Sequence, residues 1–319
     1  MADIVDRYLE SAAAASPAVE PLREISVAEW PSLHDLFQSN WPYAVEGYCL
    51  LDMLITTPGV ATSFNFRVYC PYGSIHKGMI AISETETYHM YICPVKTDNL
   101  ACMEEVLLAT KIINWNKDII VPSVMPDVMR MIDRVASVLK LEVKCNGFVV
   151  KYLKTQDSLQ FADAELPPDT YVGPLRVEHL SMVDATWPFR SETSYNYFQK
   201  LMDNNLTHVL YSASTHLPLA WVFVDETGTL SHLYSMERCR RLGYASYITK
   251  IAANNLLRNG QHVLAYSLMD NFAAQRFFIK LGFRNLGVTS WILLQKRVVN
   301  IPSCAYCRIV EFHPTPNLT

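Results

Sequence analysis

The residues whose types and spacing point most clearly to chemistry are Arg240-Arg-Leu-Gly243-Tyr-Ala245. They follow a run typical of a β-strand and precede an amphipathic helix. Small residues at Gly243 and Ala245 allow a ligand to approach the main chain, and the free N–H groups of a helix's first turn stabilise a phosphate. Arg240 and Arg241 add positive charge beside those amides. We therefore expect this turn to bind a pyrophosphate, although a glycine needed only for a tight turn would give the same short pattern.

The elements around this turn form a longer ordered pattern. Residues 219–225 and 229–235 are expected to form a β-hairpin directly before it. After the helix, residues 262–269 are expected to form a strand, and Asn271 to begin a helix that ends at Gly282. Asn271 then lies at the carboxyl end of a strand, the edge at which open α/β sheets bind ligands. The whole order is far more specific than any of its parts.

This pattern resembles the acyl-CoA core of the GNAT superfamily of N-acyltransferases. The resemblance rests on the hairpin, on Arg240-x-x-Gly243-x-Ala245, on Asn271-x-x-Ala274 and on Lys280-Leu-Gly-Phe283. The stretch from Trp187-Pro188 through the hairpin is similar to the glycine N-acyltransferase-like branch. The resemblance is strong over residues 174–295 and faint over residues 25–155.

The resemblance implies a site for acyl-coenzyme A as co-substrate. Backbone groups of Leu233, Tyr234 and Ser235 would bind the pantetheine arm as an added strand would. Asn271 would contact the cofactor near its arm or thioester. The residues that would hold the pyrophosphate are Arg240, Arg241, Leu242, Gly243, Tyr244, Ala245 and Ser246.

Two departures from the family's pattern bear on catalysis. Phe278 stands where many members carry a tyrosine thought to protonate the departing thiolate, and Arg238 replaces a carboxylate sometimes proposed as the base. His232 and Glu237 are the remaining candidates for the catalytic base that deprotonates the amine. A packed histidine, a solvated glutamate and a proton relay through water are the alternatives.

A weak internal repeat indicates two related halves. Trp41-Pro42-Tyr43 is matched by Trp187-Pro188-Phe189, 146 residues later. Each lies between two helix-like stretches and precedes a β-like run, at 64–69 in the first half and at 208–212 in the second. Chance recurrence of Trp-Pro is the alternative explanation.

The repeat predicts the domain organisation and the fold class. A polar, proline-bearing stretch over 155–174 is the best boundary, so we expect domains at 1–165 and 166–319. The fold class is α/β, an α+β mixed sheet in two tandem GNAT-like halves. The N-terminal half has no glycine turn after its strand at 88–93, and we expect it to be a degenerate copy that does not bind coenzyme A. Before Val27, a short helix and a linker are expected.

Composition excludes several classes of protein. The 319 residues are 50% hydrophobic and 18% charged, which indicates a packed interior and excludes a disordered chain. The net charge of −4 argues against binding nucleic acid over the whole surface. No apolar stretch is long enough for a membrane span and no secretory signal begins the chain, so a cytoplasmic location is expected, with mitochondria as the alternative.

Only Cys304-Ala-Tyr-Cys307 has ligand-like spacing, so we expect reduced, mostly buried thiols and no metal.

These observations predict an acyl-CoA-dependent N-acyltransferase whose partner is a small-molecule amine: glycine, another small amino acid or an arylalkylamine. The aromatic residues placed by the resemblance at the acceptor entrance are Trp187, Phe189, Tyr195, Tyr197 and Phe198, with core packing as the alternative. A catalytically inactive coenzyme A-binding sensor or interaction module is the rival reading, favoured by Phe278 and Arg238. Acylation of a protein lysine or N-terminus is the third.

Overall fold

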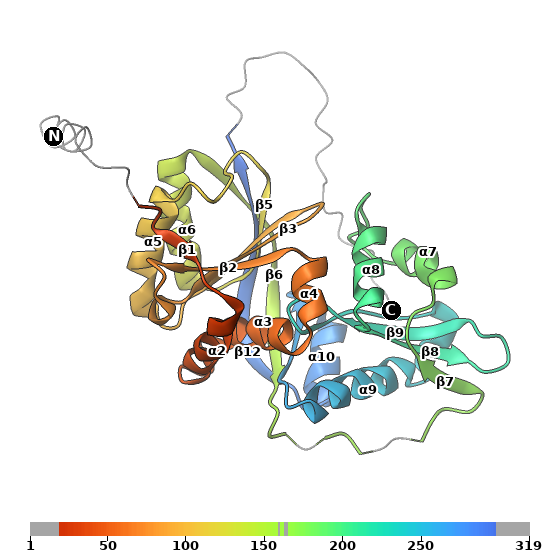
Figure 1. Ribbon diagram of the computed structural model, residues 1–319. Coiled ribbons are helices and arrows are strands. Elements are labelled where there is room, and N and C mark those ends of the chain that lie inside the picture. The colour runs from red at the N-terminus through yellow and green to blue at the C-terminus, as the bar shows by residue number, and fades with distance from the viewer. Residues whose placement is uncertain (1–18, 159, 163–164, 298–319) are drawn as a thin grey trace, which may run out of the picture.

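The computed structural model describes residues 19–158, 160–162 and 165–297 (Figure 1). The N-terminal half contains β1 (Leu22–Glu24), α2 (Trp30–Gln38), α3 (Val45–Thr56), α4 (Pro58–Ser63), β2 (Phe66–Pro71), β3 (Met79–Glu84), β4 (Tyr88–Cys93), α5 (Leu100–Ala109), β5 (Ile119–Val124), α6 (Pro126–Leu139) and β6 (Leu141–Lys154). The C-terminal half contains β7 (Thr170–Gly173), α7 (Val177–Ala185), α8 (Ser194–Asp203), β8 (Thr207–Ser212), β9 (Pro218–Val224), β10 (Thr229–Ser235), α9 (Tyr244–Arg258), β11 (Val263–Leu268), α10 (Phe272–Lys280) and β12 (Arg284–Lys296).

The two halves repeat the same order of elements, as the sequence predicted. Each half has a run of four antiparallel strands, β1 to β4 in the first half and β7 to β10 in the second. A helix and a fifth strand, parallel to the fourth, follow each run. Strands β2 and β8 occupy the same second position. Strand β8 contains the β-like run expected at 208–212, whereas β2 begins at Phe66, two residues later than the run expected at 64–69. Trp41 and Trp187 each lie in the connection between the first helices of their half. The prediction of two tandem α/β halves is confirmed.

All the strands form one mixed sheet, because the halves exchange their last strands. The order is β1-β2-β3-β4-β5-β12-β6-β11-β10-β9-β8-β7. The long strand β6 pairs antiparallel with β11 of the other half, and β12 pairs with β5. The two strands also pair with each other over most of their length, with Gly147 opposite Trp291. In Figure 1 they run between the red-to-yellow and the green-to-blue halves.

Helices cover both faces of the sheet, which explains why its strands are so apolar. In the C-terminal half, all seven residues of β9 are buried, with α7 and α8 on one side and α9 on the other (Figure 1). Helix α9 buries Ile248, Ala252 and Leu256, a spacing of four residues that makes one apolar stripe. One core cluster joins α2 and α3 of the first half to α7, α8 and β9 of the second, so the halves share a hydrophobic interior.

Near the N-terminus, part of the linker expected before Val27 is a strand. Strand β1 lies before it and pairs antiparallel with β2. Three residues are too few to show a hydrophobic period, so only the pairing reveals the strand. The helix expected before this point, and the Cys304–Cys307 pair, lie outside the described residues. The six described cysteines are free, and four of them are buried: Cys49, Cys70, Cys93 and Cys239.

Candidate functional site

The candidate cofactor site is a fork between β10 and β11. These parallel strands pair only at Thr229–Leu264 and Leu230–Ala265. A β-bulge then shifts the register between β10 and β9, and His232 within it has a φ of +50°. Beyond the paired residues, the edge of β10 that faces β11 has no ladder partner in the described chain. Backbone N–H and C=O groups at such an edge can pair with an extended ligand.

The glycine turn lies where β10 leads into α9. Gly243 adopts a left-handed conformation (φ +81°, ψ −2°) just before the helix, and a Cβ built there would have no described atom within 4 Å. Among the described residues, no side chain caps α9. The first-turn amides, at Tyr244, Ala245 and Ser246, therefore remain available to an anion, and the helix dipole favours one.

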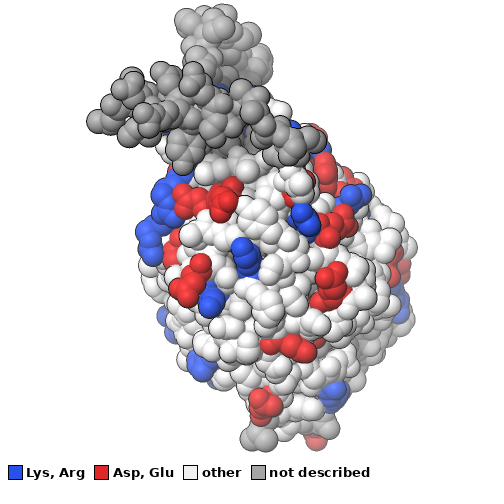
Figure 2. Space-filling view, turned by 60° about the vertical axis from the view of Figure 1, so that its left-hand side comes forward, with Lys and Arg blue, Asp and Glu red and all other residues white. Residues whose placement is uncertain are grey.

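Three arginines surround this turn. Arg241 is exposed and has a φ of +66°, and Arg238 is exposed as well. Arg240 lies 3.7 Å from Glu237 and 5.9 Å from the ring centroid of Tyr234. On the face that Figure 2 shows, which lies toward the N-terminal half, basic and acidic side chains are interspersed without a large patch of one sign. A local cationic turn on a mildly acidic protein suits a compact polyanion better than a long nucleic acid.

Asn271 lies at the end of β11, where it caps α10. Its Oδ1 accepts a hydrogen bond from the Ala274 N–H at 3.0 Å. This bond uses the side-chain oxygen and leaves the amide NH₂ to other contacts. Phe278, in the same helix, is buried, and its ring stacks on Tyr152 of the exchanged strand β6, with centroids 5.2 Å apart. The position of the missing tyrosine is thus filled by an apolar contact between the halves.

The two candidate bases lie in different surroundings. His232 projects into an aromatic cluster, with its ring centroid 4.5 Å from that of Phe198 and 5.8 Å from that of Trp187. Burial lowers the pKa of His232 to about 4, so its imidazole is neutral at pH 7. Its Nε2 is buried without a hydrogen-bond partner among the described residues. The Glu237 side chain is 79% exposed.

The aromatic residues expected at the acceptor entrance are divided between core and surface. Phe198 is fully buried, and Trp187 stacks on Tyr197 with centroids 5.9 Å apart. Phe189 and Tyr195 are exposed. Phe198 is thus a core residue, Trp187 and Tyr197 are half-buried against the core, and Phe189 and Tyr195 lie at the surface.

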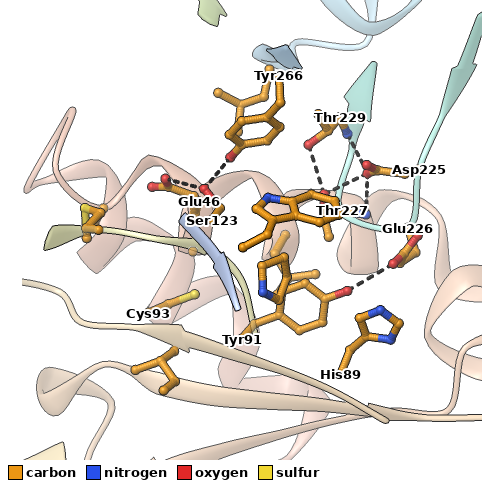
Figure 3. A pocket seen from close by; sticks show the side chains of 18 of the residues that line it. Glu46, His89, Tyr91, Cys93, Ser123, Asp225, Glu226, Thr227, Thr229 and Tyr266 are labelled. Atoms are coloured by element: carbon orange, nitrogen blue, oxygen red, sulfur yellow. Dashed lines mark hydrogen bonds between the residues drawn. The ribbon is translucent and has the colours of Figure 1, made fainter. Parts of the chain in front are cut away.

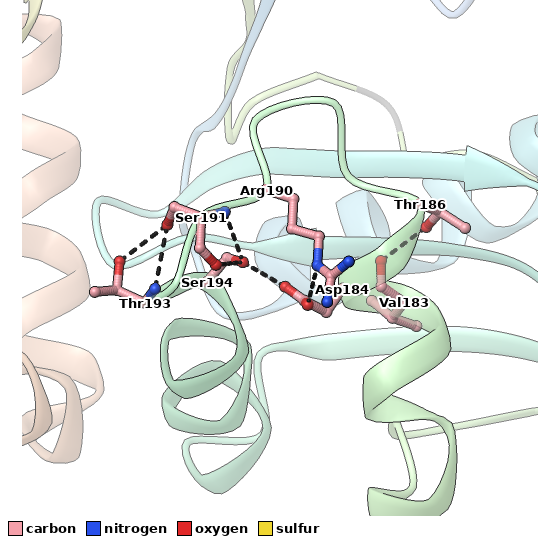
Figure 4. A network of polar contacts seen from close by, with 7 residues as sticks. All are labelled: Val183, Asp184, Thr186, Arg190, Ser191, Thr193 and Ser194. Atoms are coloured by element: carbon pink, nitrogen blue, oxygen red, sulfur yellow. Dashed lines mark hydrogen bonds and ion pairs between the residues drawn. The ribbon is translucent and has the colours of Figure 1, made fainter. Parts of the chain in front are cut away.

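A polar network fixes the turn between α7 and α8, which carries Trp187 and Phe189 (Figure 4). The buried Asp184 accepts hydrogen bonds from Ser194 Oγ and from Arg190 Nε, the latter at 2.8 Å. Ser194 Oγ in turn accepts from the Ser191 N–H at 3.1 Å. Because a buried carboxylate needs such partners, the network holds α7 and α8 at a fixed distance in front of β10.

Sequence reasoning missed a second feature, a cavity of about 80 Å³ between the halves (Figure 3). Its polar lining comes from both halves: Glu46, His89, Tyr91, Ser123, Asp225, Glu226 and Tyr266. The β9–β10 turn carries Asp225 and Glu226 into the N-terminal half. Tyr91 of β4, in the N-terminal half, donates a hydrogen bond to Glu226 at 3.0 Å. Tyr197 of α8, in the C-terminal half, donates a second at 2.8 Å. The only sequence signal for this cavity was the pair Asp225-Glu226 in a predicted turn. Because turns are usually solvated, the pair did not indicate a buried site.

Burial shifts the pKa of three groups of the cavity, those of Asp225, His89 and Tyr266. Burial, reinforced by the charge of Glu226, raises the pKa of Asp225 to about 7, although bonds from Thr227 and Thr229 oppose this. Burial lowers the pKa of His89, so its imidazole is neutral at pH 7. Burial raises the pKa of Tyr266 well above its usual value, so the phenol stays protonated, and its oxygen accepts a hydrogen bond from Ser123 Oγ at 2.8 Å.

The N-terminal half has an equivalent fork without the glycine turn. Strands β4 and β5 pair only at Tyr88–Ile119 and His89–Ile120. The connection after β4 begins with buried residues, Pro94 and Val95. Asn99 Oδ1 then accepts a hydrogen bond from the Lys96 N–H at 2.9 Å. This backbone N–H, just before α5, is therefore paired with a side chain and not offered to an anion. This agrees with a copy whose anion-binding turn is degenerate.

The forked sheet, the bulge in β10 and the helix that follows belong to a GNAT-like α/β fold in two tandem copies. The family model described as FR47-like protein matches residues 210–292, from β8 to β12. A Drosophila protein solved by a structural genomics consortium is similar at a TM-score of 0.74 with 18% identity, over 86% of this chain and 98% of that one.

Two further solved structures are similar at lower scores. A tandem GNAT protein from the clavulanic acid biosynthesis pathway has a TM-score of 0.50 at 10% identity, over 88% of this chain and 99% of that one. A putative acetyltransferase from Pyrococcus horikoshii has a TM-score of 0.50 at 9% identity, over 86% and 89%. No curated protein sequence matches the chain. At these identities the likenesses establish the fold.

The residues of the fork fit an acyl-coenzyme A. Besides the unfilled space at Gly243, Ser235 Oγ on β10 is buried without a hydrogen-bond partner among the described residues.

None of the described helices is long and apolar enough to cross a membrane. Within the described residues, no group of three or more His, Cys, Asp or Glu side chains is placed to hold a metal ion.

Proposed function

We propose that this protein is an acyl-CoA-dependent N-acyltransferase whose acceptor is the amine of a small molecule, drawn from glycine, other small amino acids and simple amines. The fork between β10 and β11, open beside the uncapped helix α9, is the observation that carries the proposal. It offers free backbone edges to an extended arm and free amides to a pyrophosphate. The acyl thioester supplies an activated carbonyl carbon.

The proposed roles follow from these positions. Leu233, Tyr234 and Ser235 bind the pantetheine arm, and a backbone N–H after the bulge stabilises the oxyanion that forms at the carbonyl. Residues 240–246 hold the pyrophosphate, and the free NH₂ of Asn271 faces the arm. The amine nitrogen bonds to the carbonyl carbon, the C–S bond breaks, the base takes a proton from the amine and the thiolate is protonated by water.

The function is tested by measuring coenzyme A binding calorimetrically, and thiol release from acyl-CoAs with a panel of amines. We expect saturable binding and amine-stimulated release, with the N-acyl product seen by mass spectrometry. Binding without stimulated release by any amine would identify the inactive sensor instead. Release stimulated only by a lysine-containing peptide would identify a protein acyltransferase.

We predict that removing His232 slows the reaction more than removing Glu237. The imidazole lies at the bulge and is neutral, hence able to accept a proton, down to a pH near its pKa of about 4. His232→Phe should lower kcat/KM by about 10-fold to 10⁴-fold, the usual scale of general base catalysis. The exposed carboxylate of Glu237 is expected to contribute less than about threefold, measured with Glu237→Gln.

The matched control for His232→Phe is His208→Phe. Burial also lowers the pKa of His208 to about 4, but its ring bonds to Asn255 of α9, away from the bulge. The His208→Phe variant should leave kcat/KM unchanged. Equal losses in both variants would assign the effect to stability, and an unchanged rate in His232→Phe would move the base to another residue or to water.

A further inference from the structure

The cavity between the halves lies on the face of β11 that can reach the fork. Leu264 and Tyr266 line it, and Leu268, at the end of β11, has its side chain on the same face because strand residues alternate. Ala265 faces the other way, since it pairs with Tyr152, whose ring stacks on α10. The cavity therefore lies within two strand residues, about 7 Å, of the open end of β11.

The charge of the cavity is negative. Three carboxyl groups line it, those of Glu46, Asp225 and Glu226, and none of the described lining residues is Lys or Arg. The nearby Lys151 ammonium donates to Glu46 Oε1 and so neutralises one of the three. An anionic group entering this space would meet no unpaired cation of the lining, and burial would make the repulsion costly.

Two carboxylate oxygens remain without a donor. Glu46 Oε2 is buried and accepts no hydrogen bond from the described residues. Asp225 Oδ1 accepts three bonds from its own turn, from the Thr227 N–H and Oγ1–H and the Thr229 N–H, and no described donor reaches Oδ2. Figure 3 shows both carboxylates on the walls of the cavity. Glu46 Oε2 is the buried acceptor of the two, and such an atom requires a donor; an ammonium group supplies three.

The remaining walls are apolar and narrow. Leu50, Leu264 and Trp291 line the cavity. Its volume of about 80 Å³ is below the roughly 150 Å³ of a cavity that holds benzene. The space therefore admits an ammonium group and a few carbon atoms, with any larger body lying outside.

We propose that this cavity is the acceptor pocket, and that it selects a primary amine bearing no carboxylate over glycine and other amino acids. The proposal rests on the proposed function, and it narrows the acceptor class. The amine binds as its ammonium ion beside Asp225 and Glu46 and gives up one proton to water before its nitrogen attacks the thioester. A free amino acid is excluded because its carboxylate would enter the same acidic space.

The decisive comparison uses glycine and glycinamide, two acceptors of nearly equal size that differ in the carboxylate. At pH 8, above the pKa of about 7 of Asp225, we expect kcat/KM to favour glycinamide by at least about tenfold, after correction for the fraction of unprotonated amine. Asp225→Asn keeps the oxygen that caps the turn and removes the charge. It should reduce this preference to within about threefold.

Two further variants test whether a lost preference for glycinamide has a cause other than the removed charge of Asp225. Asp133→Asn, at an exposed position of α6, is the matched control and should keep the wild-type preference. If Asp225→Asn does not fold, Glu226→Gln removes a charge of the same cavity and retains an oxygen for a tyrosine hydroxyl. A preference for glycine, or a preference for glycinamide that both cavity variants retain, would overturn the proposal.

Binding is measured separately from turnover, so that the two proposals can fail independently. Thermal shifts with n-propylamine and with glycine should show stabilisation by the amine only, lost in Asp225→Asn. Amine binding without turnover would leave the pocket standing and refute the enzymatic function. Turnover without amine stabilisation, with glycine and glycinamide equally good, would leave the function standing and refute the pocket.

Discussion

Gly243→Asp is expected to weaken coenzyme A binding by at least about 100-fold, because it places a negative side chain where the phosphates would sit. Gly243 has a φ of +81°, and a Cβ there would meet no described atom. The fold therefore accommodates the side chain at the cost of about 1–2 kcal/mol of backbone strain. Calorimetric titration with coenzyme A measures the effect.

Two control variants separate charge from strain. Gly243→Asn brings a side chain of the same size without the charge, and should retain more affinity than the aspartate. Gly260→Asp introduces the same residue at another glycine with positive φ (+77°) and open space, beyond the far end of α9. It should leave affinity intact. Unchanged affinity in a folded Gly243→Asp variant would refute the placement of the pyrophosphate.

The second large effect concerns the exchanged strands. We propose that the boundary between the two copies lies at 165/166, between β6 and β7, although β6 completes the sheet of the second copy. A fragment spanning 166–297 lacks β6, so β11 and β12 lose their shared neighbour. It also loses the buried side chains Val149, Val150, Tyr152 and Leu153.

We expect this fragment to show no cooperative thermal transition. At about 1.5–3 kcal/mol for each buried side chain, the loss is roughly 6–12 kcal/mol, which is comparable to the whole stability of a domain. A fragment spanning 141–297 restores β6 and should regain a transition, followed by circular dichroism. Cooperative folding of 166–297 alone would mean that the C-terminal half does not depend on the exchanged strand.

The sequence by itself determined the local elements of the C-terminal half. The hairpin, the turn at Gly243, the strand before Asn271 and the helix after it each depend on residues close together in the chain. Hydrophobic period, glycine conformation and capping act over such short distances. The Trp41 and Trp187 repeat extended the prediction to the first half, where β4 coincides with the strand expected at 88–93 and β2 overlaps the run expected at 64–69.

The tertiary structure decided what depends on distant residues. An apolar alternation fixes which face of β6 or β12 is buried, but not which strand lies beside it, so the exchange was not predicted. His232 was placed on its strand from sequence, whereas the bulge depends on how β10 pairs with β9, and aromatic rings from β9 and α8 bury the imidazole and keep it neutral. The cavity joins Glu46, Tyr91 and Asp225, and burial there raises the pKa of Asp225, a carboxyl group that would be ordinary in water. Long-range packing creates that environment, and no local pattern contains it.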